Sequence, residues 1–146
     1  MSDVPRISPA EAYAKVTGEG YTYVDVRAED EFEEGHPAGA LNVPLLVRGP
    51  AGLEPNPEFL GVMERLFARD APIVVGCQKG GRSLRAARAL VAAGFTRVVD
   101  QRAGWDGVRG TFGEVLEPGW ARAGLPSATG TPAGCTYAEV KERARR

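Results

Sequence analysis

The sequence contains little histidine or cysteine and no strong excess of either charge. Its 146 residues include one histidine and two cysteines, and the formal net charge is −1. Cys77 and Cys135 are far apart in the sequence, so together with His36 they do not form the closely spaced ligand set of a structural zinc site. The balanced charge gives no basic bias toward nucleic acid. We therefore expect no metal, no cofactor and no nucleic-acid partner.

Long apolar runs are also missing. No stretch is apolar for long enough to span a bilayer. The first six residues lack the cationic start and apolar core of a signal peptide. We therefore expect no membrane partner and a cytoplasmic location. The length suits one domain with a real hydrophobic core.

Segments of strand-forming and helix-forming character alternate along the chain. Strands are predicted near Ile7 and over 21–26, 40–43, 73–75 and 97–100, and helices over 9–16, 29–34, 58–69 and from Ser83 to Gly94. This alternation predicts an α/β fold with a mainly parallel central sheet and helices on both faces. Residues 49–57 are rich in proline and glycine and are predicted to form a surface loop. Residues 137–146 are predicted to form a charged helix.

The most informative stretch begins at Ile73 and ends at Leu84. The β-branched run Ile73-Val74-Val75 follows a proline and suits a strand buried on both faces. Ser83 is a good N-cap residue for the helical pattern that follows it. Cys77 is thus predicted at the carboxyl end of a strand, facing the amino end of a helix, where ligands bind in open α/β sheets.

Cys77 is a candidate nucleophile because its loop favours a thiolate. The helix presents about half a positive charge at its amino end, and peptide N–H groups in the loop can form a cradle for an anion. An anionic sulfur in such a cradle can carry a second sulfur as a persulfide without a general base. The remaining loop residues, which supply N–H groups, flexible glycines, two cations and a hydroxyl, are Gln78, Lys79, Gly80, Gly81, Arg82 and Ser83. The alternative is a buried structural cysteine, which the glycines and cations make the weaker interpretation.

These residues carry a family resemblance. The segment from Cys77 to Ser83 resembles the active-site loop of rhodanese-domain sulfurtransferases, with four residues between cysteine and arginine. Further segments resemble that family in the same order along the chain: Val24-Asp25-Val26-Arg27, Glu31-Phe32, residues 35–44, Ala103-Gly104-Trp105 and Gly124-Leu125-Pro126. The resemblance covers about residues 7 to 126. Residues 1–126 are therefore assigned to a rhodanese domain and 127–146 to a C-terminal tail, with a short helix packed on or beside the domain.

The resemblance implies a rhodanese-like fold and a sulfurtransferase. Cys77 would take the outer sulfur of thiosulfate, or of a similar donor, as a persulfide and pass it to cyanide, a thiol or a protein acceptor. Arg82 would order the loop or meet the donor's charge, and Lys79 would attract the donor. Trp105 is a candidate pocket wall. Arg102 stands where the family often has a small residue, and it points either toward the donor or to solvent.

Other functions stay open at this point. One alternative is a persulfide carrier in protein sulfur delivery, and another is a non-catalytic rhodanese-like binding module. A phosphatase or arsenate reductase is disfavoured because related phosphatase loops have five residues between cysteine and arginine, which leaves room for a tetrahedral oxyanion.

Four residues outside the loop have side chains that could act in catalysis, and we interpret them as non-catalytic. Asp25 and Arg27 are interpreted as a charged pair that ties a strand end to the next segment. His36 lies in a Gly/Pro turn and is interpreted as fixing that turn by a hydrogen bond, although its usual pKa is near neutral. Cys135 is either a resolving thiol for Cys77 or an incidental cysteine, and we favour the second interpretation.

Overall fold

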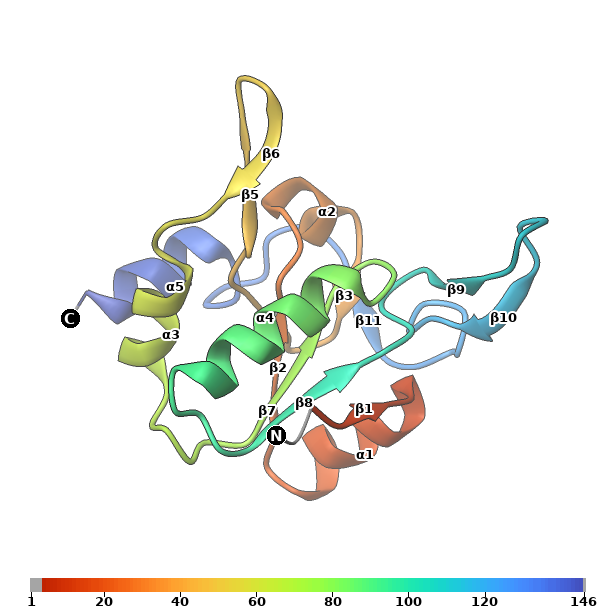
Figure 1. The fold of residues 1–146 in the computed structure, drawn as a ribbon, viewed down its shortest axis with the longest axis horizontal. Helices are drawn as coiled ribbons and strands as arrows, with labels where there is room; N and C mark the ends of the chain where they lie inside the picture. The colour runs from red at the N-terminus through yellow and green to blue at the C-terminus, as the bar shows by residue number, and fades with distance from the viewer. Residues whose placement is uncertain (1–3, 146) are drawn as a thin grey trace.

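A computed structural model describes residues 4–145 of the chain. Its centre is a five-stranded sheet in the order β1-β8-β7-β2-β4, in which all neighbouring strands are parallel (Figure 1). The strands are β1 (Arg6–Ile7), β2 (Thr22–Asp25), β4 (Leu41–Asn42), β7 (Ile73–Gly76) and β8 (Val98–Gln101). The middle strand β7 is buried along its whole length, as its β-branched run predicted.

Helices cover both faces of this sheet, and the α/β prediction is confirmed. The helices are α1 (Pro9–Gly18), α2 (Glu29–Glu34), α3 (Phe59–Leu66), α4 (Gly81–Ala92) and α5 (Tyr137–Ala144). Ile73 and Val75 point to the face covered by α3, α4 and α5, whereas Val74 points to the face covered by α1. Because β7 is packed on both faces, the segment that follows it is held firmly at the carboxyl edge of the sheet.

Local sequence signals account for where the helices begin. Ser8 Oγ accepts a hydrogen bond from Glu11 N at 3.1 Å, and Glu11 Oε1 accepts one from Ser8 N at 2.9 Å, which is a capping box for α1. Asn56 Oδ1 accepts a hydrogen bond from Glu58 N at 3.0 Å just before α3. Helix α3 ends at Leu66, so the predicted extension to residue 69 is wrong.

Two antiparallel hairpins project from the body of the domain (Figure 1). The first, β5 (Leu46–Gly49) with β6 (Gly52–Pro55), occupies much of the segment predicted as a loop, and that prediction is therefore wrong. The proline and glycine residues that suggested an irregular loop lie at the ends and in the turn of a hairpin. The second, β9 (Gly107–Arg109) with β10 (Val115–Pro118), directly follows the segment beside the cysteine loop.

The segment after residue 126 is held against the rest of the domain. Strand β11 (Ser127–Ala128) pairs with β3 (His36–Pro37). Tyr137, Val140 and Ala144 of α5 are buried in the same apolar cluster as α3 and α4. Within residues 4–145, none of the helices has the length and apolar character needed to cross a bilayer.

Candidate active site

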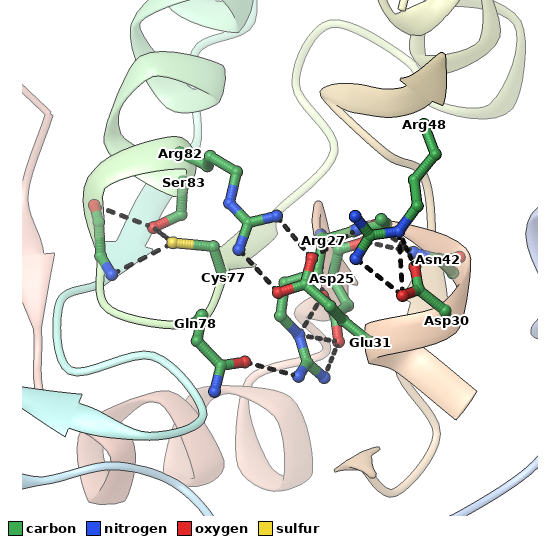
Figure 2. Close-up of polar contacts among 12 residues, drawn as sticks. Asp25, Arg27, Asp30, Glu31, Asn42, Arg48, Cys77, Gln78, Arg82 and Ser83 are labelled. Carbon is green, nitrogen blue, oxygen red and sulfur yellow. Dashed lines mark hydrogen bonds and ion pairs between the residues drawn. The ribbon is translucent and has the colours of Figure 1, made fainter. Parts of the chain in front are cut away.

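Cys77 lies one residue beyond β7, at the bottom of a tight loop that leads into α4. Its side chain is buried, and the residue is 3% exposed. Gly80 N donates a hydrogen bond to Cys77 Sγ at 3.1 Å, and Ser83 Oγ lies 3.4 Å from the same sulfur (Figure 2). The loop thus curls around the sulfur, as the sequence predicted, with a backbone donor and a hydroxyl both in contact with it.

Gly80 decides where α4 begins. Its φ of +97° is a left-handed conformation that glycine adopts without strain. Because the chain turns there, Gly80 is the N-cap and α4 starts at Gly81. The prediction that Ser83 caps the helix is therefore wrong. Ser83 instead lies in the first turn of α4, where its hydroxyl faces Cys77 Sγ and also donates to Gly80 O at 3.3 Å.

The loop presents peptide N–H groups that have no acceptor. Within residues 4–145, no hydrogen-bond acceptor is found for the N–H groups of Gln78, Lys79, Gly81, Arg82 and Ser83. Gly81, Arg82 and Ser83 form the first turn of α4, where unpaired donors are expected, and together with the helix dipole they favour an anion. The loop therefore offers unpaired donors for an anion, next to a sulfur that already accepts a hydrogen bond from Gly80 N.

A buried ion pair holds the side chain of Gln78. Arg27 and Asp25 are each 2% exposed and pair at 2.7 Å, which confirms the charged pair expected from the sequence. Arg27 also donates to Gly35 O at 2.6 Å and to Gln78 Oε1 at 3.0 Å. The pair thus ties the end of β2 to the next turn, as expected, and also to the cysteine loop, which the sequence did not reveal.

The two cations of the loop behave differently. Lys79 is exposed and has no carboxylate partner within the described residues. Arg82 forms a two-bond ion pair with Glu31 of α2, at 2.6 and 2.9 Å (Figure 2). The hydrogen bonds that Arg82 donates to Glu31 raise the pKa of Arg82 above its usual value. Burial alone would raise the pKa of Glu31, but Arg82 outweighs burial and holds it below its usual value. The pair is therefore ionised at neutral pH.

The segment after β8 supports the cysteine loop from below. Trp105 N donates to Cys77 O at 2.8 Å, and Asp106 N donates to Gln78 O at 2.9 Å. Gln101 is fully buried, and its Oε1 accepts from the N–H groups of residues 103 and 104 at 2.8 Å each. This role of Gln101 was not predicted from the sequence. The available signal was a polar residue at the end of an apolar strand.

The side chains of Trp105 and Arg102 contact residues outside the cysteine loop. The Trp105 ring packs beside Gly35 and lies 5.4 Å from the Arg27 guanidinium, so a pocket wall at Trp105 stays a prediction. Arg102 pairs with Glu117 of β10 at 2.8 Å and donates to Arg6 O at 3.2 Å. Its side chain is therefore held by the carboxylate of Glu117, and a place for Arg102 among the site residues stays a prediction.

His36 and Cys135 have structural surroundings. His36 is fully buried, stacks on Phe32 with ring centroids 3.7 Å apart, and its Nδ1 lies 2.7 Å from Phe32 O. This geometry confirms the interpretation that the histidine fixes its turn. Cys77 packs in the cluster of the α4 face, whereas Cys135 packs against the cluster of the α1 face. Both are free thiols. In the part of the chain that the structure describes, no group of His, Cys, Asp or Glu side chains is arranged to hold a metal ion.

The family model of the rhodanese-like domain matches residues 8–111. The chain belongs to the rhodanese family. The match includes β2, the cysteine loop and the supporting segment after β8. The sulfurtransferase names of its relatives agree with the expectation drawn from the loop.

Thiosulfate sulfurtransferase 16 from Arabidopsis thaliana is 42% identical over 108 residues, which are 74% of this chain and 80% of the relative. Thiosulfate sulfurtransferase GlpE from Actinobacillus pleuropneumoniae is 29% identical over 84% of this chain and 92% of the relative. Other plant relatives are matched over 56–60% of their own length. The crystal structure of Rv0390 from M. tuberculosis superposes with a TM-score of 0.72 at 27% identity and covers 88% of this chain and all of that one.

Proposed function

We propose that this rhodanese-family protein transfers a sulfane sulfur from thiosulfate, or from a similar donor, to a thiophilic acceptor. The observation that carries the proposal is that Cys77 Sγ lies at the amino end of α4, where it accepts a hydrogen bond from Gly80 N and neighbouring N–H groups have no acceptor within the described residues. An anionic sulfur placed there gains hydrogen bonds without the removal of existing ones. The same donors would hold the outer sulfur of a persulfide.

In the first half of the reaction, the Cys77 thiolate attacks the outer sulfur of thiosulfate. A new bond forms between the two sulfur atoms, the original S–S bond breaks, and sulfite leaves with the bonding electron pair. Cys77 is left as a persulfide anion. In the second half, cyanide or a thiolate attacks the outer sulfur and the Cys77 thiolate leaves. The two steps form a ping-pong cycle that needs no proton transfer for cyanide.

Each contact of the loop suggests a role in this cycle. Gly80 N–H stabilises the charge on Sγ directly at 3.1 Å. The Ser83 hydroxyl donates to Sγ when the sulfur is anionic, and to Gly80 O otherwise. Lys79 attracts the anionic donor because its charge is exposed and unpaired within the described residues.

The test compares wild type with Cys77→Ser and uses Cys135→Ser as the matched cysteine control. We expect wild type and Cys135→Ser to form thiocyanate from thiosulfate and cyanide, and to gain one sulfur atom by intact mass after thiosulfate treatment. Cys77→Ser should lose both. A sulfur adduct with little turnover would instead favour a carrier that delivers sulfur to a protein acceptor. Absence of both adduct and turnover in wild type would reject the proposal.

A further inference from the structure

Four arginines around the cysteine loop are paired with carboxylates. Arg27, which holds Gln78, pairs with Asp25, and Arg82 pairs with Glu31. Two further arginines contact Gly80 and are also paired with carboxylates. Arg6, which donates to Gly80 O, pairs with Asp100, and Arg102, whose backbone oxygen faces Gly80, pairs with Glu117. A count of cations in the sequence therefore overstates the positive charge that a donor meets.

Of these four ion pairs, the Glu31–Arg82 pair affects the electrostatic potential at the Cys77 sulfur most directly. Arg82 lies in the first turn of α4 next to Ser83, whose hydroxyl is 3.4 Å from Cys77 Sγ, and Cys77 adds to the rise in the pKa of Arg82 that Glu31 mainly causes. Arg82 and Glu31 are 17% and 21% exposed, so solvent screens their charges less than it screens a surface pair.

Glu31 is also fixed in place. Its Oε1 accepts a hydrogen bond from Ala28 N at 3.1 Å in addition to the bond from Arg82, and its Oε2 accepts the second Arg82 bond. Figure 2 shows the Arg82 side chain directed from the loop toward Glu31. The end of the Arg82 guanidinium that carries Nη1 and Nη2 is therefore held by a carboxylate, which balances its charge.

We propose that Glu31 sets the charge that a sulfur donor meets at Cys77, and so favours singly charged donors over doubly charged ones. The donor part of this inference rests on the proposed function. With Arg82 neutralised, Lys79 and the peptide N–H groups remain to bind the donor. A dianion such as thiosulfate feels the Glu31 charge twice as strongly as a monoanionic persulfide or thiosulfonate does.

The first experiment needs no sulfur transfer. Cys77 is alkylated at one pH by iodoacetate, which is anionic, and by iodoacetamide, which is neutral, in a Cys135→Ser background. The ratio of the two rates reports the electrostatic potential at the sulfur, because the thiolate fraction cancels. Glu31→Gln should raise the iodoacetate-to-iodoacetamide ratio about two- to threefold. Glu34→Gln is the matched control, since it removes the same charge from an exposed position on the same helix.

The second experiment uses two donors. Methanethiosulfonate transfers its outer sulfur as thiosulfate does, with methanesulfinate leaving with the electron pair, but it carries one charge. Glu31→Gln should raise kcat/KM about three- to tenfold for thiosulfate, and by about the square root of that factor for methanethiosulfonate. Glu34→Gln should leave the ratio of the two donors unchanged.

The outcomes separate the two proposals. An alkylation ratio that is unchanged or lower in Glu31→Gln, or that rises equally in Glu34→Gln, overturns the role of Glu31. Equal loss of kcat/KM for both donors in Glu31→Gln overturns it as well, because Glu31 would then serve only to position Arg82. If the alkylation ratio rises but wild type forms no persulfide with either donor, the charge-setting role stands, and the assignment to sulfur donors falls together with the proposed function.

Discussion

Replacing Gly104 with alanine tests whether the segment after β8 supports the cysteine loop. Gly104 has a φ of +67°, and a Cβ atom there would lie 2.6 Å from Cys77 O and 2.5 Å from Gln78 O. Real Cβ atoms essentially never approach other atoms within 3.0 Å. Because both neighbouring atoms belong to the backbone, the cysteine loop itself would have to move.

The loss of stability expected for Gly104→Ala has two parts, which a control variant can separate. The left-handed conformation costs a non-glycine residue about 1–2 kcal/mol, and forcing extra atoms into a packed site costs about 1–3 kcal/mol. Gly124 has a similar φ of +73°, and a Cβ atom there would meet nothing within 4 Å. Gly124→Ala therefore carries the conformational strain and the change in unfolded-chain entropy without the contact. We expect Gly104→Ala to be less stable than Gly124→Ala by about 1–3 kcal/mol.

The assays are urea denaturation and thiocyanate formation on the same samples. Gly104→Ala should lower kcat by more than about tenfold at a temperature where it is fully folded, because small displacements of a reacting group are costly. Gly124→Ala should keep its activity. If Gly104→Ala matches Gly124→Ala in stability and wild type in turnover, the loop does not depend on this support and the reasoning is refuted.

Two other predictions concern α5 and the Glu31–Arg82 pair. Val140→Ala should reduce the free energy of unfolding by about 1.5–3 kcal/mol because the side chain is fully buried. Val91 is half exposed, so Val91→Ala should reduce it by less than about 1 kcal/mol. Equal losses for the two variants in urea titrations would place α5 outside the core. The folded protein holds the pKa of Glu31 below its ordinary 4.5, so the stability advantage of wild type over Glu31→Gln should be full above that value and disappear as pH falls through the lower folded pKa. A stability difference that persists at lower pH, measured by urea titration, would contradict this assignment.

The sequence predicted the sheet and the position of the nucleophile because these depend on local patterns. The β-branched run before Cys77 specifies a buried strand, and its position places the cysteine at the carboxyl edge. The start of α4 was predicted three residues too late because Ser83 is a good cap by type, whereas Gly80 turns the chain earlier through its positive φ. Which of two acceptable caps is used depends on the backbone path around the sulfur, and residue type alone does not determine that path.

The partners of charged side chains were predicted less well. Arg82 was expected to order the loop or meet the donor, yet its partner is Glu31, which lies 51 positions away in the sequence. Arg102 was assigned to the site because it follows β8, but a strand of the adjoining hairpin provides its carboxylate partner. Such pairings depend on how separate segments meet in space, and no periodicity in one segment contains that information.

The direction of Arg82 also bears on the choice between sulfur transfer and oxyanion chemistry. A phosphate or arsenate group is bound best by the two parallel donors of an arginine. Here Arg82 Nη1 and Nη2 each donate to Glu31, so the charge of the arginine is already balanced, and the groups in contact with Cys77 Sγ are Gly80 N–H and the Ser83 hydroxyl. A single sulfur needs no more than these, whereas a tetrahedral oxyanion with two negative charges would meet an arginine whose charge Glu31 already balances. The four-residue spacing and the Glu31–Arg82 pair therefore favour the same chemistry for independent reasons, and Glu31→Gln separates them because it frees Arg82 without changing the length of the loop.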